Sequence, residues 1–238
     1  PLPCRHLRNI IMNMKNTLLI LIVAVVAVAA GSWFSSTQKT AQEEAIEAAR
    51  AKFASVQGNI LSPPRKIAVP ELVKHDGSPF NSKDLQGQWS ILFFGFTNCH
   101  MICPTAMSML TQAKKLAEEK KVAFPQVYLV SVDPERDDPA TMSKFVTGFD
   151  KDFIGVTGDP ESIKALSLQM SVIYMRAQSE KADESGNSSA DKGGEENYQI
   201  DHSAAMLLIN PQGSLTAFLN APHTPTSILK DIQIVSEN

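Results

Sequence analysis

Two cysteines four positions apart, Cys99 and Cys103, are the residues of this chain whose type and spacing point most directly to chemistry. They follow an apolar run at residues 91–96, whose aromatic and β-branched side chains predict a buried strand. Pro104 predicts the start of a helix, with Cys103 at the N-cap and Cys99 in the loop just before it. Unpaired backbone N–H groups at a helix N-terminus favour the thiolate, which is the form that attacks disulfides and binds metals. A pair of thiolates suits Cu(I) or Zn(II), and does not suit a hard cation such as Mg(II).

A structural disulfide between Cys99 and Cys103 is the alternative use of this pair. It would close a very short loop and stabilise the fold by about 2 kcal/mol, at the low end for disulfides. The order strand, cysteines, helix is typical of thioredoxin-like folds, whose redox enzymes use C-x-x-C. This chain has C-x-x-x-C, and the additional residue lets the two sulfurs separate enough to share a metal. The spacing therefore favours metal binding over a structural crosslink.

The composition fits one globular domain with appendages. The chain has 238 residues, 43% of them hydrophobic and 20% charged, with a formal net charge of −3. Neither the net charge nor any basic cluster indicates nucleic-acid binding, and that class of function is set aside. Cys4 and His6 lie at the beginning of the chain and are assigned no role.

The N-terminal part of the chain predicts a membrane anchor. Residues 17–34 are apolar and about long enough to cross a bilayer as a helix. Basic residues but no acidic ones precede them, so residues 1–16 are expected in the cytoplasm and the rest of the chain outside. A cleaved signal peptide is the alternative, because residues 27–29 (Ala-Val-Ala) resemble a cleavage site. The aromatic pair Trp33-Phe34 favours the retained anchor.

Residues 35–64 predict a helical stalk followed by a linker. The stalk is rich in helix-forming residues and should end at Gly58, and the two prolines at positions 63 and 64 mark the linker. The folded domain is expected to occupy residues 65–238. Within it, residues 178–197 contain no large apolar side chain and predict a mobile polar loop.

Strands alternate with helices in the expected domain, which predicts an α/β fold with a central mixed sheet, parallel strand pairs and helices on both faces. Strands are expected at residues 67–73, 91–96, 126–132, 153–156, 172–177, 198–200, 206–209 and 215–219. Helices are expected at residues 104–121, 139–147 and 160–170, with a helical turn at 81–85 and a C-terminal helix. Asp138, Asp159 and either Thr224 or Thr226 are the expected N-caps of the last three helices.

His202 is the best placed histidine for a third metal ligand, since it lies in a turn expected at the end of the sheet. A lone histidine in such a loop is more often an ordinary polar residue than a ligand. The neighbouring Asp201 could orient a nearby ligand by accepting a hydrogen bond from it, a pairing common at metal-binding histidines. The residues alone leave both interpretations of His202 open.

Four segments together resemble the SCO/SenC family, which comprises membrane-anchored, thioredoxin-like copper proteins that assemble the dinuclear copper centre of cytochrome c oxidase. The segments are residues 94–104 with both cysteines, 131–137 (SVDPERD), 153–158 (FIGVTG) and 201–203 (DHS) followed by a hairpin. The resemblance implies a thioredoxin-like fold and a copper ion, Cu(I) or Cu(II), bound by Cys99, Cys103 and His202. For the SVDPERD segment, a strand-to-helix turn with an internal Asp–Arg pair and a functional role both remain open.

The chain departs from the family pattern beside the first cysteine. His100 stands where the family usually has a proline, and Met101 follows it. Both side chains could bind copper in principle, but we interpret His100 and Met101 as a solvent-facing pair in a short loop.

The resemblance implies a metallochaperone, which receives copper from an upstream donor and delivers it to the copper-site subunit of cytochrome c oxidase without turnover. The alternative is a membrane-anchored thiol-disulfide reductase that keeps the cysteines of that subunit reduced and is itself served by a thiol reductant. Thioredoxin-type oxidoreductases place a proline beside the active site, but no proline occurs between Pro160 and Pro211. This weakens the reductase interpretation without excluding it. The N-terminal segment lacks the character of a transit peptide, which favours a bacterial cytoplasmic membrane with the domain facing the periplasm.

Overall fold

The computed structural model describes residues 53–176, 200–202 and 204–237, together with Trp33 and scattered positions between 43 and 51. Of Arg176, Asp201 and His202 only the backbone is described. The chain divides into two units, Pro1–Lys52 and Phe53–Asn238. The predicted segment 1–16, nearly all of the predicted anchor 17–34 and the polar loop 178–197 lie outside the described residues. Within the described part of the chain, no helix is both long enough and apolar enough to span a membrane.

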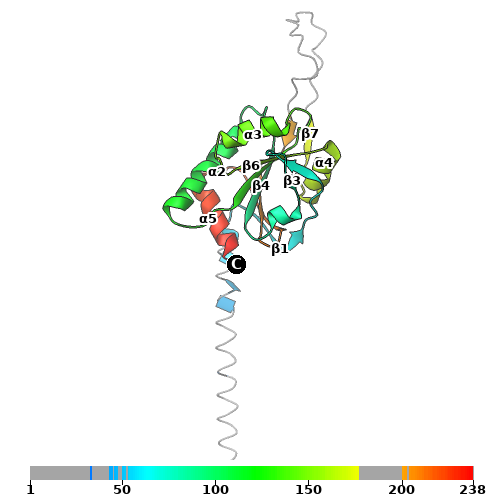
Figure 1. The fold of residues 1–238 in the computed structure, drawn as a ribbon. Coiled ribbons are helices and arrows are strands. Elements are labelled where there is room, and N and C mark those ends of the chain that lie inside the picture. The colour runs from blue at the N-terminus through cyan, green and yellow to red at the C-terminus, as the bar shows by residue number, and fades with distance from the viewer. Residues whose placement is uncertain are drawn as a thin grey trace, which may run out of the picture. The chain divides into compact units, whose positions relative to one another are not determined.

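The second unit is organised around a mixed sheet of eight strands in the order β1-β10-β9-β4-β5-β6-β2-β3 (Figure 1). Its central strands β4 (Ser90–Gly95), β5 (Gln126–Ser131) and β6 (Ile154–Thr157) run parallel, and the other pairings are antiparallel. The remaining strands of this sheet are β1 (Gly58–Lys66), β2 (Leu72–Lys74), β3 (Pro79–Phe80), β9 (Met206–Ile209) and β10 (Ser214–Leu219). A separate antiparallel pair consists of β7 (Tyr174–Arg176) and β8 (Ile200–His202). All six residues of β4 are buried, as the continuous apolar run predicts.

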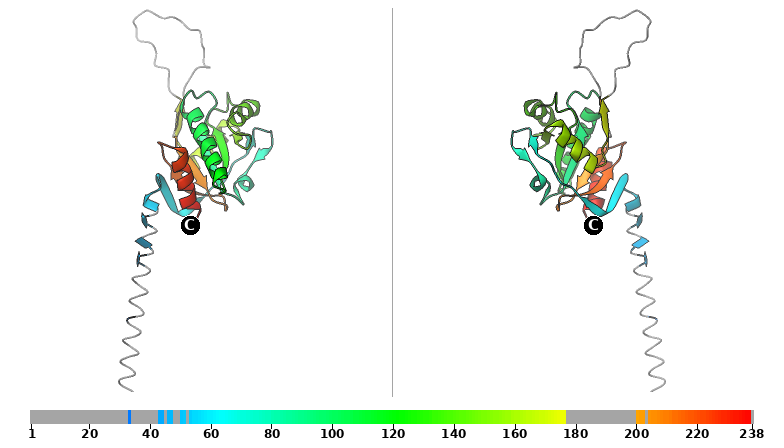
Figure 2. Two further views of the ribbon diagram at one scale, coloured as in Figure 1. Left: turned by 90° about the vertical axis from the view of Figure 1, so that its left-hand side faces the viewer. Right: turned by 90° about the vertical axis from the view of Figure 1, so that its right-hand side faces the viewer.

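Helices cover both faces of the sheet. They are α2 (Ile102–Glu119), α3 (Pro139–Thr147), α4 (Pro160–Gln169) and α5 (Pro225–Ser236), with a 3-10 helix at Ser82–Leu85. The helices α2 and α5 pack side by side over one face, and α4 lies over the opposite face (Figures 1 and 2). The predicted central mixed sheet flanked by helices is therefore confirmed.

The predicted N-caps of three helices are confirmed by their hydrogen bonds. The side chain of Asp138 accepts from the N–H of Thr141, and that of Asp159 accepts from the N–H groups of Glu161 and Ser162. Thr224, and not Thr226, caps α5 in a reciprocal capping box with Ser227. Local residue types were sufficient to predict these helix starts because a cap contacts only the next three residues.

The N-terminal boundary of the folded unit differs from the prediction. Residues 58–64, expected to be linker, belong to β1, which pairs with β10 at the edge of the sheet. The two prolines fall between Ile60 and Arg65, where the register with β10 shifts. A proline in a bulge of an edge strand removes no ladder hydrogen bond, so here the pair marks an irregular strand and not a linker. Val56, just before the strand, is buried in the core.

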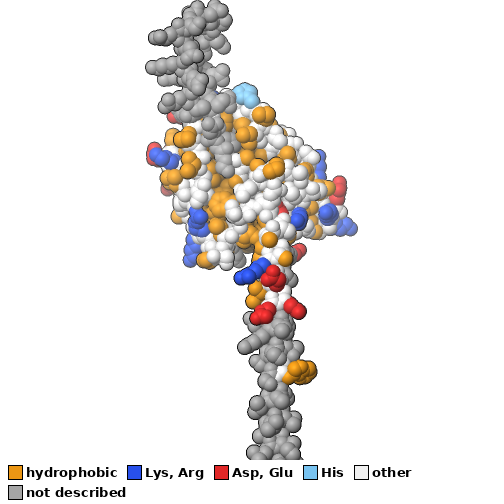
Figure 3. All heavy atoms as spheres, turned by 180° about the vertical axis from the view of Figure 1, so that it is seen from behind, with side chains coloured by type: hydrophobic (Ala, Val, Ile, Leu, Met, Phe, Trp, Pro, Cys, Tyr) orange, Lys and Arg blue, Asp and Glu red, His pale blue; other side chains and the backbone are white. Residues whose placement is uncertain are grey.

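Several large apolar side chains are exposed on the folded unit, among them Met101, Ile102, Leu168, Ile173 and Met175. On the face seen in Figure 3, apolar side chains occupy much of the surface and charges of both signs lie toward its margins. Single exposed apolar residues are normal in soluble domains. Met101 and Ile102, however, stand between the two cysteines, so exposed apolar surface adjoins the cysteine loop.

Candidate metal centre

The two cysteines lie together just beyond the C-terminal end of the central strand β4. Cys99 lies in the loop after Gly95, and Cys103 lies in the first turn of α2. Both are thiols and not a disulfide, and both are buried, with 8% of Cys99 and 0% of Cys103 exposed. The backbone N–H of Cys103 donates a hydrogen bond to Cys99 Sγ over 3.4 Å. The helix N-terminus therefore contributes an N–H donor to the sulfur of Cys99.

The helix begins two residues earlier than predicted. Met101 is its N-cap and Pro104 occupies the third helical position, so Cys103 is not the N-cap. Proline is tolerated there because the first N–H groups of a helix have no partner within it. The first regular bond of this helix runs from the N–H of Thr105 to the carbonyl of Met101, over 3.2 Å. Steric restriction before a proline is a preference and does not fix the helix boundary.

Burial works against the thiolate of Cys103. Burial is the largest cause that raises the pKa of this thiol, the nearby Cys99 and Asp137 raise it further, and only a hydrogen bond to the backbone at Phe96 lowers it. The expectation that the helix N-terminus favours the thiolate of both cysteines is therefore wrong for Cys103 without metal. A bound cation would reverse this balance, because a coordinating thiol gives up its proton. Two adjacent sulfurs in a nearly water-free site form a soft donor set that fits Cu(I).

Gly95 leaves the space that the Cys103 sulfur occupies. A Cβ atom at this position would lie 2.7 Å from Cys103 Sγ and 3.1 Å from Leu129 Cδ1. Both distances are shorter than ordinary van der Waals contacts, so any side chain at position 95 would displace the sulfur or its neighbours. The amino-acid sequence gives no sign of this role of Gly95, because the contact depends on the packing of α2 over β4.

Asp137 ties the start of the cysteine loop to the neighbouring strand. Its carboxylate accepts hydrogen bonds from Thr97 Oγ1 at 2.5 Å, from the Thr97 N–H at 3.1 Å and from Ser131 Oγ at 2.6 Å. Burial raises the pKa of Asp137, and these three hydrogen bonds oppose the rise because they favour the carboxylate. Thr97 lies two residues before Cys99, so the hydrogen bonds of Asp137 fix the position at which the cysteine loop begins.

Asp133 and Arg136 of the SVDPERD segment pair with each other, and the Arg136 guanidinium also lies over the Phe96 ring, 5.9 Å from its centroid. Arg136 Nε pairs with the Asp133 carboxylate, and the Asp133 carbonyl accepts a hydrogen bond from the N–H of Asp137 over 3.0 Å. The predicted turn with an internal Asp–Arg pair is thus confirmed. The long-range contact of Asp137 was not predicted, because its partner Thr97 lies 40 residues earlier in the chain.

His202 is the last residue of β8, and its backbone lies opposite Tyr174 of β7. It therefore belongs to a strand, whereas a turn was expected at this position. Its side chain lies outside the described part of the structure. Ala204, two residues further on, lines the same groove as Met101 and Ile102, so the chain next to His202 reaches the cysteine loop. Among the described side chains, which exclude that of His202, no group of three or more His, Cys, Asp or Glu residues could hold a metal.

His100 and Met101 are both exposed, which confirms the prediction that this pair faces solvent.

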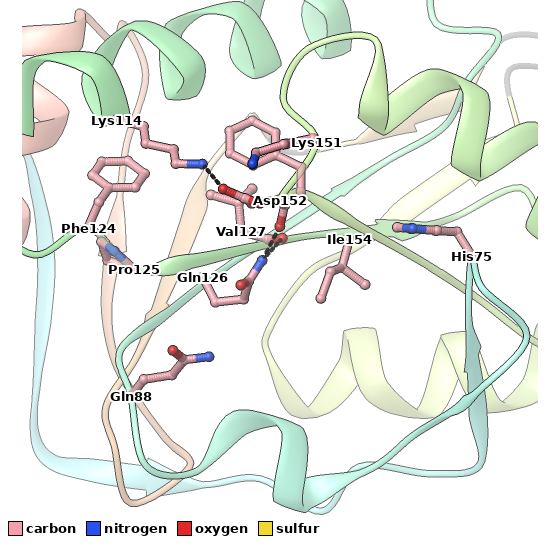
Figure 4. A pocket seen from close by; sticks show the side chains of 11 residues that line it. His75, Gln88, Lys114, Phe124, Pro125, Gln126, Val127, Lys151, Asp152 and Ile154 are labelled. Atoms are coloured by element: carbon pink, nitrogen blue, oxygen red, sulfur yellow. Dashed lines mark hydrogen bonds and ion pairs between the residues drawn. The ribbon is translucent and has the colours of Figure 1, made fainter. Parts of the chain in front are cut away.

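A separate pocket of about 440 Å³ lies at the opposite end of the sheet, near the first residues of β5 (Figure 4). Several of its polar groups make contacts with neighbouring residues. Lys114 Nζ pairs with Asp150 at 2.8 Å and with Asp152 at 2.7 Å, and His75 Nδ1 accepts a hydrogen bond from the Gly155 N–H. These interactions join α2, the α3–β6 loop and the turn after β2. We therefore interpret these polar side chains as structural contacts between elements and not as a binding site.

The fold and the site define the class of this protein. It is a thioredoxin-like α/β protein with a buried pair of thiols at the start of a helix. The family model for SCO1/SenC matches residues 65–237. The SCO2-like protein of Rickettsia prowazekii is 34% identical over 158 residues, which are 66% of this chain and 71% of the relative. The chain belongs to the SCO1/SenC family.

Solved structures agree with this assignment. Arabidopsis thaliana ScoI with copper bound aligns with a TM-score of 0.58 and 31% identity over 74% of this chain and 96% of the ScoI chain. Yeast Sco1 with copper bound aligns with a TM-score of 0.58 and 25% identity over 71% of this chain and 87% of the Sco1 chain.

Proposed function

We propose that this protein is a copper chaperone, which binds one copper ion through Cys99, Cys103 and His202 and delivers it to the copper-site subunit of cytochrome c oxidase. The observation that carries the proposal is the pair of buried thiols brought together at the start of α2. Membership of the SCO1/SenC family and the copper bound in the structures of the Arabidopsis and yeast relatives support it.

The two sulfurs would allow copper to be bound and then released to a recipient protein. Copper binding displaces the proton that burial holds on Cys103, so affinity should rise with pH as the thiols become easier to ionise. Cys99 is the less completely buried cysteine, and a thiolate of the recipient would approach the copper from its side. Ligand exchange through Cys99 then transfers the ion without any change in its oxidation state.

The same geometry favours a second candidate, a thiol-disulfide reductase. Cys99, with the N–H of Cys103 directed at its sulfur, would attack a disulfide of the oxidase subunit and form a mixed disulfide. Cys103 would then attack Cys99, release the reduced subunit and leave a Cys99–Cys103 disulfide. A thiol reductant would have to reduce that disulfide before another cycle.

The variant His202→Ala separates the two candidates. A site of two sulfurs still holds Cu(I) but should lose most of its Cu(II), for which imidazole is a better match than thiolate. Dithiol exchange should persist, because it depends on the cysteines and the helix N-terminus. Changing either cysteine to Ser should abolish both behaviours. Oxidase assembly in cells then decides: normal assembly with His202→Ala, without added copper, would show that copper held through His202 is not essential and would favour the reductase.

We place the folded domain on the periplasmic side of a bacterial cytoplasmic membrane, held by residues 17–34. The apolar length of this segment and the basic residues before it support the placement. Fractionation should recover the intact chain with the membrane. Recovery of a soluble protein that starts near Gly31 would identify the segment as a cleaved signal peptide instead.

A further inference from the structure

The side chain of His223 holds the backbone next to the proposed third copper ligand. Its Nε2 lies 3.0 Å from the carbonyl oxygen of Ala204, a residue 19 positions earlier in the chain. A carbonyl only accepts hydrogen bonds, so Nε2 carries a proton and is the donor. Ala204 comes two residues after His202. The hydrogen bond therefore fixes the chain just beyond the proposed ligand.

The strands on either side of this hydrogen bond are fixed as well. Before it, β8 pairs with β7 and places the backbone of His202 opposite Tyr174. After it, the chain enters β9, whose first residue, Met206, is fully buried. The short connection from β8 to β9 thus has a strand pairing at each end, and His223 adds an attachment between them.

His223 is itself held by the residues next to it. The carbonyl of Pro222 accepts a hydrogen bond from Gln57 Nε2 at 2.7 Å. On the other side, Thr224 is the N-cap of α5 and forms a reciprocal capping box with Ser227. Because both neighbours of His223 are tied to other elements of the fold, its ring can serve as a fixed point for Ala204.

The attachment adjoins the cysteine loop. His223 and Ala204 line a groove of about 280 Å³ together with Met101 and Ile102, which stand between the two cysteines. The hydrogen bond to Ala204 is therefore made close to the dithiol, where a third ligand from β8 would be needed.

We propose that His223 is a positioning residue of the copper site, which holds the segment that carries His202 beside the cysteine loop. The proposal rests on the proposed function, in which His202 completes the copper site. A ligand whose backbone is already fixed loses less conformational freedom when it binds a metal, so the affinity is higher. Imidazole is a better match for Cu(II) than thiolate is, so His223 should matter for Cu(II) and little for Cu(I).

The test compares His223→Leu with His223→Gln in the full chain. Leucine removes the donor, whereas the side-chain amide of glutamine supplies an N–H in its place. His75→Leu is the matched control. His75 is also a half-buried histidine whose ring is hydrogen-bonded to the backbone, since Nδ1 accepts from the Gly155 N–H at 2.8 Å, but it lies at the opposite end of the sheet.

Two measurements should respond to the loss of the donor. In metal-free His223→Leu, backbone amides of residues 200–206 should exchange with solvent at least about threefold faster. The Cu(II) affinity of this variant should fall about three- to tenfold, the range that one hydrogen bond contributes, with weaker imidazole nitrogen couplings in its electron paramagnetic resonance spectrum. Its Cu(I) affinity should change less than about twofold, because two sulfurs suffice for Cu(I). His223→Gln should restore both properties, and His75→Leu should alter neither.

Combining His223→Leu with His202→Ala separates this proposal from the proposed function. If His223 acts through His202, its loss should not weaken Cu(II) binding further once His202 is gone. An equal loss with and without His202 would overturn the proposal, as would unchanged amide exchange in His223→Leu. If His202→Ala loses Cu(II) but His223→Leu keeps it, the role of His223 is wrong and the three-ligand site stands. If His202→Ala keeps its Cu(II), the three-ligand site is wrong and the role of His223 falls with it.

Discussion

The variant Gly95→Ala tests whether the packing of β4 against α2 sets the position of the Cys103 sulfur. The added methyl group would lie 2.7 Å from Cys103 Sγ, whereas non-bonded heavy atoms normally rest about 3.5–4.0 Å apart. The sulfur must therefore move by roughly 1 Å, or Leu129 and the helix must give way. Because Cys103 is fully buried, it has no empty space to move into.

Overpacking of this kind costs about 1–3 kcal/mol of folding free energy. For a domain of this size, that corresponds to a melting temperature lower by about 2–12 °C. Copper affinity should fall by about tenfold or more, comparable with the loss when groups that orient metal ligands are removed. Thermal unfolding of the metal-free protein and competition for Cu(I) against a chelator measure the two effects.

Gly155→Ala is the matched control for this experiment. A Cβ at Gly155 would lie 2.9 Å from Met142 Cβ, and its three nearest neighbours belong to Met142 and His75, so it overpacks the interface of α3 with β6 and not the cysteine site. It should lower the melting temperature similarly and leave copper affinity unchanged. If Gly95→Ala binds copper as tightly as the unchanged protein, or if both variants lose affinity equally, packing at Gly95 does not set the position of the Cys103 sulfur.

Two further predictions concern Cys103 and Asp137. Because burial raises the pKa of the folded Cys103 thiol, folded protein keeps a proton that the unfolded chain loses, so the melting temperature should fall as pH rises above about 8.5. Cys103→Ser should make the melting temperature less dependent on pH in this range. In the folded protein at pH 8, iodoacetamide should modify Cys99 before Cys103. The reverse order, read by peptide mapping, would contradict a raised pKa of Cys103. Asp137→Ala leaves the donors of Thr97 and Ser131 without their acceptor, and should destabilise the protein by about 1–3 kcal/mol in denaturant unfolding and weaken copper binding. Unchanged copper affinity would show that Asp137 does not position the cysteine loop.

Local sequence patterns were sufficient to predict the elements that carry the site. The run before the cysteines predicted β4. Asp138, Asp159 and the alternative of Thr224 or Thr226 predicted the starts of three helices, because a cap or a buried strand depends on residues within a few positions. The pair Cys99 and Cys103 could be recognised as the chemical centre for the same reason, since their spacing is itself local.

Two local preferences of proline gave wrong element boundaries. Pro104 indicated a helix start, but α2 begins at Ile102, since the first turn needs no N–H from its third residue. The prolines before Arg65 indicated a linker, but they occupy a bulge in β1 that β10 holds in the sheet.

The amino-acid sequence by itself identified two soft sulfurs after a buried strand as candidates for the chemistry, whereas residue types alone left the role of His202 open. Only the tertiary structure decided their environment. It placed Gly95 against the Cys103 sulfur, brought Asp137 to Thr97, and set His223 against the carbonyl of Ala204. The physical reason is that burial and contact between distant segments depend on how the elements pack. Burial thereby raises the pKa of the Cys103 thiol, whereas the local position at a helix start favours the thiolate.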